Sequence, residues 1–261
     1  MFTPVSHSGY VITGNVIQGN PVGVYFNASG ATQPEVANNC TRLNNAGFGV
    51  QPAAGNGVYS DPGLDNALIH HNVFFGHQNG AIILDKYQNT LRVDVNNNVS
   101  HQDRAMVFIF RSNDSLVTDN TAVGTTVPAI VIGDDNHNLQ VLRNDIQGSD
   151  GGVLTVTFLP QGSDQVQISD NTISDAAQDG IDVSPNSLTD STISGNTVTN
   201  SGRDGILIED KGGNLITGNV SQSSVQFDCE DLTTGSGTAG TANTWTANRA
   251  ATSNPAGEGP Q

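Results

Sequence analysis

The densest group of chemically active side chains lies between residues 77 and 111 of this 261-residue chain. Two short apolar runs, beginning at Gly80 and Ala105, are each preceded by a histidine and followed by charged residues. Histidine exchanges protons near neutral pH, and Lys or Arg can neutralise an anionic group on a bound molecule. The candidate catalytic residues are His77, His101, Lys86, Arg111 and Asp85, and the neighbouring Asp103 and Arg104 are candidate binding residues.

A repeat of about 24 residues must position these side chains. Its clearest mark is an asparagine with an aliphatic residue three positions before it and another two positions after, as in Ile193, Asn196 and Val198. A period of this length indicates stacked units rather than a conventional globule. The asparagines are Asn15, Asn39, Asn72, Asn98, Asn120, Asn144, Asn171, Asn196 and Asn219.

The second mark of the repeat is a small residue that opens an alternating apolar run. We therefore predict a wound solenoid of parallel β-structure with two short strands per coil and about nine to ten coils. Coils stacked about 4.8 Å apart give each strand two ladder partners and join the inward residues into one core. The small residues are Gly23, Gly57, Gly80, Ala105, Ala129, Gly152, Gly180 and Gly205.

We interpret the asparagines as an inward ladder. Asparagine tolerates the left-handed backbone of a tight corner, and its amide can hydrogen-bond to the amide of the next coil. The alternative is that these residues only form turns. Spacing from the small residues also predicts that His77 and His101 lie on one corner in adjacent coils.

The Ile-x-x-Asn-x-Ile coils resemble the right-handed parallel β-helix repeat family, the pectate-lyase-like superfamily, over about residues 8 to 245. The resemblance implies an all-β, right-handed, single-stranded parallel β-helix. It is weak for function, because the family includes polysaccharide lyases, hydrolases, epimerases, tailspikes and adhesins. In its lyases and epimerases a base removes the proton α to a uronate carboxylate, which Arg, Lys or calcium neutralises.

Lys86, Arg111 and Asp85 supply the residue types that this chemistry would need, and the two histidines could supply the base from another corner. The specific motifs of polygalacturonases, pectate lyases and mannuronan epimerases do not occur in the sequence. The alternative is that these residues are the solvated charges of ordinary solenoid turns.

Two Asp-Gly pairs 25 residues apart predict an acidic corner. Stacked carboxylates repel each other, so they either splay into water or share a cation. Asp179 and Asp204 are therefore candidate metal ligands, with calcium as the expected ion.

The second strand of each coil also predicts an outward-facing stripe that is almost entirely apolar or aromatic. Such a stripe is typical of a covered face, either a shelf for sugar rings with Tyr25 and Tyr59 as binding residues or a homo-oligomer interface. The predicted outward residues are Tyr25, Tyr59, Ile82, Val107, Val131, Leu154, Asp182 and Leu207.

Composition limits the partners. A net charge of −16 with nine Lys and Arg argues against nucleic acid, because phosphate neutralisation needs clustered basic residues. It also disfavours bare polyanionic sugars, unless calcium or a local basic patch intervenes. The sequence has no transmembrane run, so membrane insertion is not expected. Scarce charge with abundant Asn, Thr, Ser and Gly is typical of an exported bacterial protein, and we expect a secreted or cell-surface location.

A single elongated domain is expected over residues 1–261, because no break in composition interrupts the repeat. Residues 226–261 are expected to form a C-terminal cap in which Trp245 covers the last coil. The repeat starts within about ten residues, so we expect a fragment of a longer secreted protein. Cys40 and Cys229 lie about seven coils apart, roughly 34 Å, which is too far for a disulfide.

The sequence leaves two functions open. The first is an extracellular module that binds or processes a polysaccharide along the solenoid face, and as an enzyme it would be a lyase, an epimerase or a hydrolase. The second is a non-catalytic, adhesin-like segment that serves as a spacer or an oligomer interface.

Overall fold

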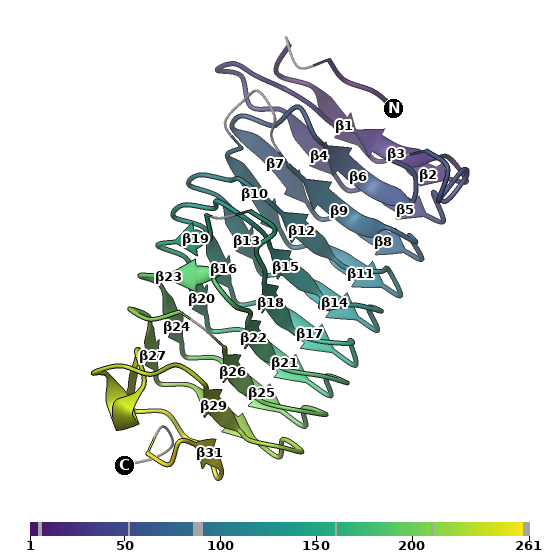
Figure 1. Ribbon diagram of the computed structural model, residues 1–261. Helices are drawn as coiled ribbons and strands as arrows, with labels where there is room; N and C mark the ends of the chain where they lie inside the picture. The colour runs from purple at the N-terminus through teal and green to yellow at the C-terminus, as the bar shows by residue number, and fades with distance from the viewer. Residues whose placement is uncertain (5–6, 52, 86–90, 160, 210, 258–261) are drawn as a thin grey trace.

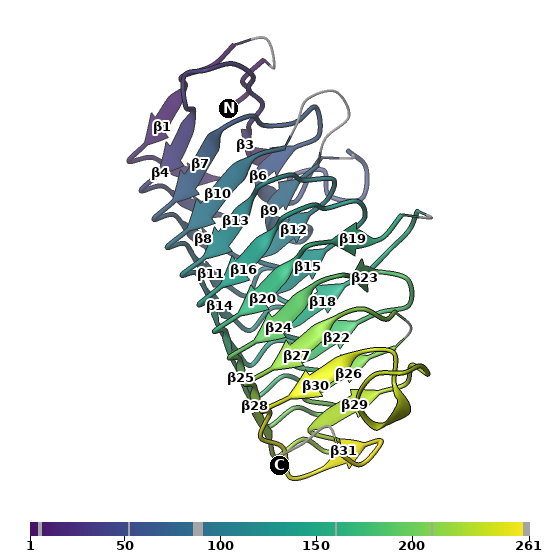
Figure 2. The same ribbon diagram turned by 90° about the vertical axis from the view of Figure 1, so that its left-hand side faces the viewer.

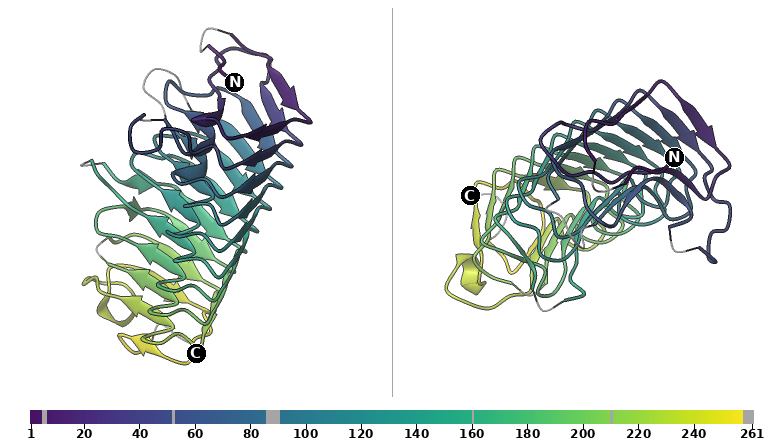
Figure 3. Two further views of the ribbon diagram at one scale, coloured as in Figure 1. Left: turned by 90° about the vertical axis from the view of Figure 1, so that its right-hand side faces the viewer. Right: turned by 90° about the horizontal axis from the view of Figure 1, so that it is seen from above.

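Three parallel sheets wind around one core in the computed structural model, which describes residues 1–4, 7–51, 53–85, 91–159, 161–209 and 211–257. The coils form an elongated stack with the two termini at opposite ends (Figure 1). Figure 2 faces the first sheet, and Figure 3 shows the stack from a third side and from above. The described helical structure is one 3-10 turn, η1 (Thr238–Gly240), so no helix in these ranges is long or apolar enough to cross a membrane.

Each sheet takes its strands from successive coils, and its neighbouring strands pair in parallel. The first sheet contains β1 (Val11–Thr13), β4 (Glu35–Ala37), β7 (Ala67–His70), β10 (Val93–Asn96), β13 (Leu116–Thr118), β16 (Gln140–Leu142), β20 (Gln167–Ser169), β24 (Thr192–Ser194), β27 (Leu215–Thr217) and β30 (Thr244–Thr246). The second contains β2 (Val16–Gln18), β5 (Cys40–Arg42), β8 (Val73–Phe75), β11 (Val99–His101), β14 (Thr121–Val123), β17 (Asp145–Gln147), β21 (Thr172–Ser174), β25 (Thr197–Thr199) and β28 (Val220–Gln222).

The third sheet carries the candidate site described below. It contains β3 (Val22–Tyr25), β6 (Asn56–Ser60), β9 (Gly80–Leu84), β12 (Val107–Ile109), β15 (Ile130–Ile132), β18 (Val153–Thr155), β22 (Ile181–Val183), β26 (Ile206–Ile208), β29 (Cys229–Asp231) and β31 (Ser253–Asn254). Strands β19 (Ser163–Asp164) and β23 (Leu188–Thr189) pair separately in the connections from the third sheet to the first.

The prediction of a parallel β-solenoid is confirmed, but the coil has three strands where two were predicted. The asparagine motif itself spans two strands, because the residue directly before each ladder asparagine has left-handed backbone and turns the chain. Asn97 and Asp119, for example, have φ of 52° and 57°. The bend therefore lies one residue before the asparagine, and it divides what looked like a single strand.

The asparagine ladder is confirmed and gains a tenth rung, Asn248. The side-chain Nδ2 of each rung donates to Oδ1 of the next at 2.9–3.1 Å. The same Oδ1 also accepts the backbone N–H of the preceding rung. From Asn39 to Asn248 the rungs are at most 2% exposed, so the ladder satisfies polar groups that water cannot reach.

Inward side chains of the three sheets stack into one apolar core. In the first sheet this column ends at Trp245, which pairs in register with Ile216 and is 4% exposed. Its indole Nε1 donates to Asp231 Oδ2 at 2.8 Å. The indole therefore has a partner for its N–H group while its ring fills the last position of the core in the first sheet, as a cap would. Cys40 on β5 and Cys229 on β29 lie in different sheets near opposite ends of the stack and are not joined to each other.

Replacing a central rung should destabilise the protein far more than replacing the first one. Asn120→Ala removes the amide that bonds Asn98, Asn144 and the Val95 carbonyl, and each buried group left unpaired costs about 1–3 kcal/mol. We expect urea unfolding to show a loss of about 3 kcal/mol or more, against less than about 1 kcal/mol for the partly exposed Asn15→Ala. Equal losses would contradict a stabilising role for the ladder.

Candidate active site

The third sheet carries one line of outward side chains, which we call the outward column. The predicted stripe therefore exists, but in two coils it lies one residue later than predicted. Ile83 and Phe108 point outward, whereas Ile82 and Val107 are buried in the core. The reason is that Ala81 and Met106, each one residue after the predicted small residue, take the corner position that Gly57 has in the preceding coil. The outward column consists of Tyr25, Tyr59, Ile83, Phe108, Val131, Leu154, Asp182, Leu207, Glu230 and Asn254.

The outward column changes chemistry along the stack. It is aromatic or aliphatic from Tyr25 to Leu154, and the first carboxyl group is Asp182 on β22. The third sheet runs down the middle of Figure 1, so this change lies between the labels β18 and β22. The apolar part and the acidic part of one face are therefore continuous.

Asp182 lies in a cavity of about 190 Å³ that Pro128, Leu154, Asp179 and Arg203 help to line. Burial, reinforced by the charges of Glu209 and Asp179, raises the pKa of Asp182 from its ordinary 3.8 to about 7. Its Oδ1 atom is buried, and no described residue hydrogen-bonds to it. Asp182 can therefore hold a proton near neutral pH at the wall of this cavity.

Asp179 borders the same cavity in a different electrostatic setting. Its Oδ2 lies 3.2 Å from Arg203 Nη1, and its Oδ1 accepts the backbone N–H of Asp204 at 2.9 Å. A cation and an N–H on the two oxygens compensate the charge of a carboxylate. The cavity thus places a carboxyl group with a raised pKa beside an ion-paired carboxylate, which is the kind of pair that acid–base catalysis uses.

Two further acids surround Arg203. Burial raises the pKa of Asp204, although the N–H of Phe227 donates to its carboxylate at 2.9 Å and opposes that shift. Burial also raises the pKa of Glu209. Asp182, Asp204 and Glu209 thus all lie in the field of the Arg203 guanidinium, which opposes the rise of their pKa values.

Glycine allows this corner to form. A β-carbon on Gly180 would lie 2.6 Å from the carbonyl oxygen of Gly205, and one on Gly205 would lie 2.5 Å from that of Asp228. The repeated Asp-Gly pair therefore brings Asp179 and Asp204 to the same corner, as the sequence predicts. Within the described ranges no group of three or more His, Cys, Asp or Glu is arranged to hold a metal ion, and calcium binding here stays a prediction.

His77 and Asp103 belong to the interior and cannot touch a bound molecule. Both are at most 1% exposed. His77 Nδ1 donates to Asp103 Oδ1 at 2.7 Å, and its Nε2 accepts from the Asn44 amide at 3.2 Å. The Ser100 hydroxyl donates to Asp103 at 2.6 Å. These contacts link three coils through a buried polar network, which is a structural role.

His101 lies on another face. It is exposed on β11 of the second sheet, in register with Phe75 and Val123. The prediction that it shares a corner with His77 is wrong, because Asp103, two residues later, is the corner residue of that coil.

The remaining predicted residues are only partly brought together. Asp85 and Arg111 form an ion pair between adjacent coils. Lys86 lies outside the described residues. Arg104 is exposed, and its Nη1 lies 3.4 Å from Asn79 Oδ1. Catalysis by this group stays a prediction.

Tyr25 and Tyr59 do lie on the outward column. Their rings meet edge to face with centroids 5.3 Å apart, and the Tyr25 hydroxyl donates to Asp61. Both rings are half-buried. The two predicted binding residues thus face the same side as Asp182, five or more strands away from it.

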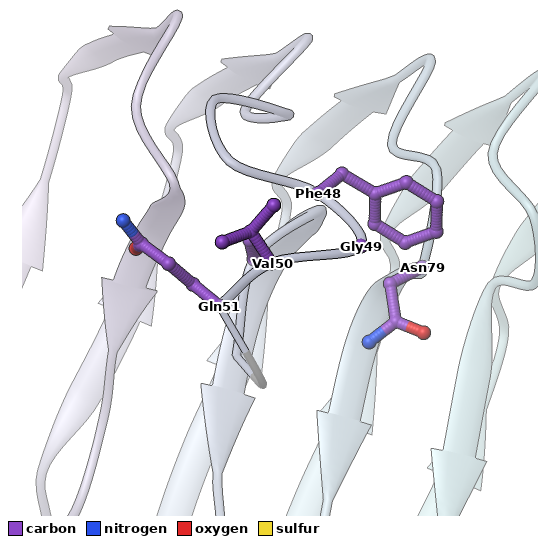
Figure 4. A pocket seen from close by; sticks show the side chains of 6 residues that line it. Phe48, Gly49, Val50, Gln51 and Asn79 are labelled. Atoms are coloured by element: carbon purple, nitrogen blue, oxygen red, sulfur yellow. The ribbon is translucent and has the colours of Figure 1, made fainter.

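The insertion between β5 and β6 forms a pocket at the edge of the third sheet. Phe48, Gly49, Val50, Gln51, Ala54 and Asn79 line its volume of about 330 Å³ (Figure 4). The Phe48 ring packs so closely on Gly55 that a β-carbon there would lie 2.6 Å away. The Phe48 ring lies beside Asn79, whereas the Gln51 side chain points away from the ring (Figure 4).

The sequence missed a second charged cluster, around His137. Its Nδ1 lies 2.5 Å from Asp164 Oδ1, and its Nε2 lies 3.1 Å from Asp135 Oδ1. The hydrogen bond to Asp164 is the main cause of a raised His137 pKa. Lys211 and these three side chains border a cavity of about 240 Å³ at the connection from the third sheet to the first.

The sequence predicts Asp182 in the outward stripe but does not place it among the candidate site residues, although it carries a signal for that role. Asp182 is the single acidic residue among the eight predicted outward positions. A lone carboxyl group in an apolar stripe predicts desolvation, which is the cause of its raised pKa.

Asp182→Asn should make the protein more stable at alkaline pH. The pKa of Asp182 is higher in the folded protein than in the unfolded chain, so ionising this carboxyl group costs more free energy in the folded state. The free energy of unfolding therefore falls as pH rises through about 7. We expect Asp182→Asn to gain up to about 4 kcal/mol over wild type at pH 8 and almost nothing at pH 4. Urea unfolding at both pH values measures this difference, and a gain that is independent of pH would contradict it.

The His137 cluster should stabilise the protein mainly in acid. Since its pKa is raised, its stabilising contribution is complete below its ordinary value of 6.5 and is lost as pH rises through the folded-state pKa. We expect His137→Gln to lower the melting temperature at pH 5.5 and to have little effect at pH 9. A larger loss at pH 9 than at pH 5.5 would refute this assignment.

The sequence and fold match known proteins. A family model described as the right handed beta helix region matches residues 5–159 and 56–221. No curated protein matches the chain. A mutant tailspike protein of E. coli bacteriophage HK620, in complex with a pentasaccharide, superposes with a TM-score of 0.60 at 12% identity over 93% of this chain and 46% of that one.

A second solved structure is the catalytic unit of a GH87 alpha-1,3-glucanase from Streptomyces thermodiastaticus strain HF3-3. Its TM-score is 0.57 at 14% identity, over 89% of this chain and 53% of that one. The chain spans about half the length of these structures, and at such identities the likeness shows a shared fold. The family match over most of the sequence, the parallel strand register and the asparagine ladder show that this chain belongs to the right-handed β-helix family.

Proposed function

We propose that the outer face of the third sheet binds a polysaccharide and that Asp182 and Asp179 hydrolyse a glycosidic bond in it. The observation that carries the proposal is the half-buried Asp182, with its pKa raised to about 7, in a cavity beside the ion-paired Asp179. The tailspike protein with its pentasaccharide and the alpha-1,3-glucanase support carbohydrate as the ligand class, since both share the fold. A secreted or cell-surface location belongs to the proposal and is supported by composition.

Each carboxyl group has one role in the reaction. Asp182 gives its proton to the glycosidic oxygen as the bond from that oxygen to the anomeric carbon breaks. Asp179 takes a proton from a water molecule, whose oxygen forms the new bond to the anomeric carbon. The products are two shorter sugar chains, and the two carboxyl groups have exchanged protonation states until solvent restores them.

Arg203 and Glu209 position and tune this pair. Arg203 holds Asp179 by its ion pair, while the charge of Glu209 helps to keep the proton on Asp182. Asp182 is then the acid whose loss of a proton stops the reaction. The rate should therefore decrease as pH rises through about 7.

The decisive experiment measures release of reducing sugar ends from α-1,3-glucan, dextran and yeast mannan. Asp182→Asn should lower the rate by about 10²–10⁴-fold, which is the usual contribution of a general acid, while the folded protein is retained. Asp170→Asn is the matched control, because Asp170 is an exposed carboxylate at the corner between the first and second sheets. The control should keep full activity.

Binding without hydrolysis by the wild type would overturn the catalytic roles and leave a lectin-like module. Neither binding nor hydrolysis would overturn the proposal as a whole and favour the alternative of a non-catalytic adhesin-like spacer.

A further inference from the structure

We infer that the ligand is an uncharged polysaccharide. We also infer that a chain of about six or more sugar units is needed to fill the site, because each sugar unit advances roughly one strand spacing along the column. This inference rests on the proposed function and names its substrate class. It combines two features of the outward column, its length and its charge.

The length follows from the strand register. Tyr59 on β6 and Asp182 on β22 occupy the same position of the coil, with β9, β12, β15 and β18 between them. Five strand spacings separate them, which is about 24 Å. An extended sugar chain that lies along the column therefore touches both residues only if it has about six units.

The floor of this path suits the apolar faces of sugar rings. Tyr59, Ile83, Phe108 and Leu154 are all partly exposed, and each presents a ring or a branched aliphatic group, whereas Val131, between the last two, is 3% exposed. Aromatic and aliphatic surfaces pack against the C–H faces of pyranose rings, whereas the sugar hydroxyls at the rim remain in water. The pocket that Phe48 helps to line adds the side-chain amides of Gln51 and Asn79 at the end of the sheet where Tyr59 lies.

The charge of the site excludes an acidic sugar. Among the described residues that line the Asp182 cavity, Arg203 is the one cation, and it is paired with Asp179. Asp204 and Glu209 add to the negative field there. A uronate or sulfate group would have to enter this field without a free cation, in a chain with a net charge of −16.

The position of Asp182 also predicts where the chain is cut. The column continues beyond Asp182 through Leu207, which is 2% exposed, to the partly exposed Glu230, so a sugar chain that passes over Leu207 can lie on both sides of the reacting bond. Cleavage should therefore occur inside the chain and release oligosaccharides rather than single sugars.

The test uses the full chain carrying Asp182→Asn, so that the probes stay intact during binding measurements. The probes are oligosaccharides of about two to about ten units from α-1,3-glucan, dextran and yeast mannan, with polygalacturonate fragments of equal length as the charged comparison. Calorimetry should show affinity rising about tenfold or more as the bound neutral probe grows from about four to about seven units. The charged fragments should not bind.

Adding Tyr59→Ala should remove the gain for long probes and leave the affinity for short ones unchanged. Tyr59→Leu keeps apolar bulk without the ring and should remove most of the gain even if the alanine variant is unstable. Phe75→Ala is the matched control, because Phe75 is an exposed aromatic residue on the second sheet. It should bind every probe as the parent does.

Affinity that is independent of length, or equal losses from Tyr59→Leu and Phe75→Ala, would overturn the inference while leaving hydrolysis at Asp182 intact. Tight binding of polygalacturonate would overturn the uncharged class. Light scattering that shows a dimer broken by Tyr59→Leu would identify the column as the predicted homo-oligomer face instead. Failure of every probe to bind would count against the proposed function itself.

Discussion

The structure depends on the need to satisfy every backbone group at a corner that water does not reach. The asparagine ladder does this at the turn between the first and second sheets, where each Oδ1 accepts two N–H groups and each Nδ2 donates to the next rung. The same contacts fix the vertical register of the coils, because a slip by one residue would break them and reverse the faces of the strands. A regular outward column on the third sheet is a direct consequence of this register.

Carboxylates take over the ladder function at the corner before the third sheet. Asp179 accepts the N–H of Asp204, and Asp204 accepts the N–H of Phe227. These hydrogen bonds are structural, but they also concentrate negative charge beside the outward column. Asp182 stands next to this corner, and its partial burial, reinforced by the charges of Glu209 and Asp179, raises its pKa.

At the candidate site, the residue that suits catalysis also lowers the stability of the fold. A protonated Asp182 suits acid catalysis, yet above pH 7 its ionised form is a buried charge that weakens the fold. The ladder and the continuous core can tolerate this, because stacked coils add their interface energies along the stack. His77 is the opposite case, since its contacts with Asp103 and Asn44 make a potentially reactive side chain part of the interior.

The sequence by itself determined the repeat, the parallel solenoid, the ladder residues, the acidic corner and the presence of an apolar stripe. These follow from local periodicity, because each coil repeats the same inward and corner positions. It did not determine that the asparagine motif spans two strands. The turn is made by the residue before each asparagine, which has left-handed backbone, and the type of this residue differs between coils, for example Gly14 and Asp119. No shared residue type therefore marks the turn in the sequence. Only the tertiary structure decided that His77 stacks on Asp103 rather than on His101, and that Asp182 is desolvated beside Asp179 and Arg203. Which residues of adjacent coils lie side by side depends on the strand register to a single residue. The ladder asparagines are 22 to 33 residues apart, and this variable spacing does not determine the register.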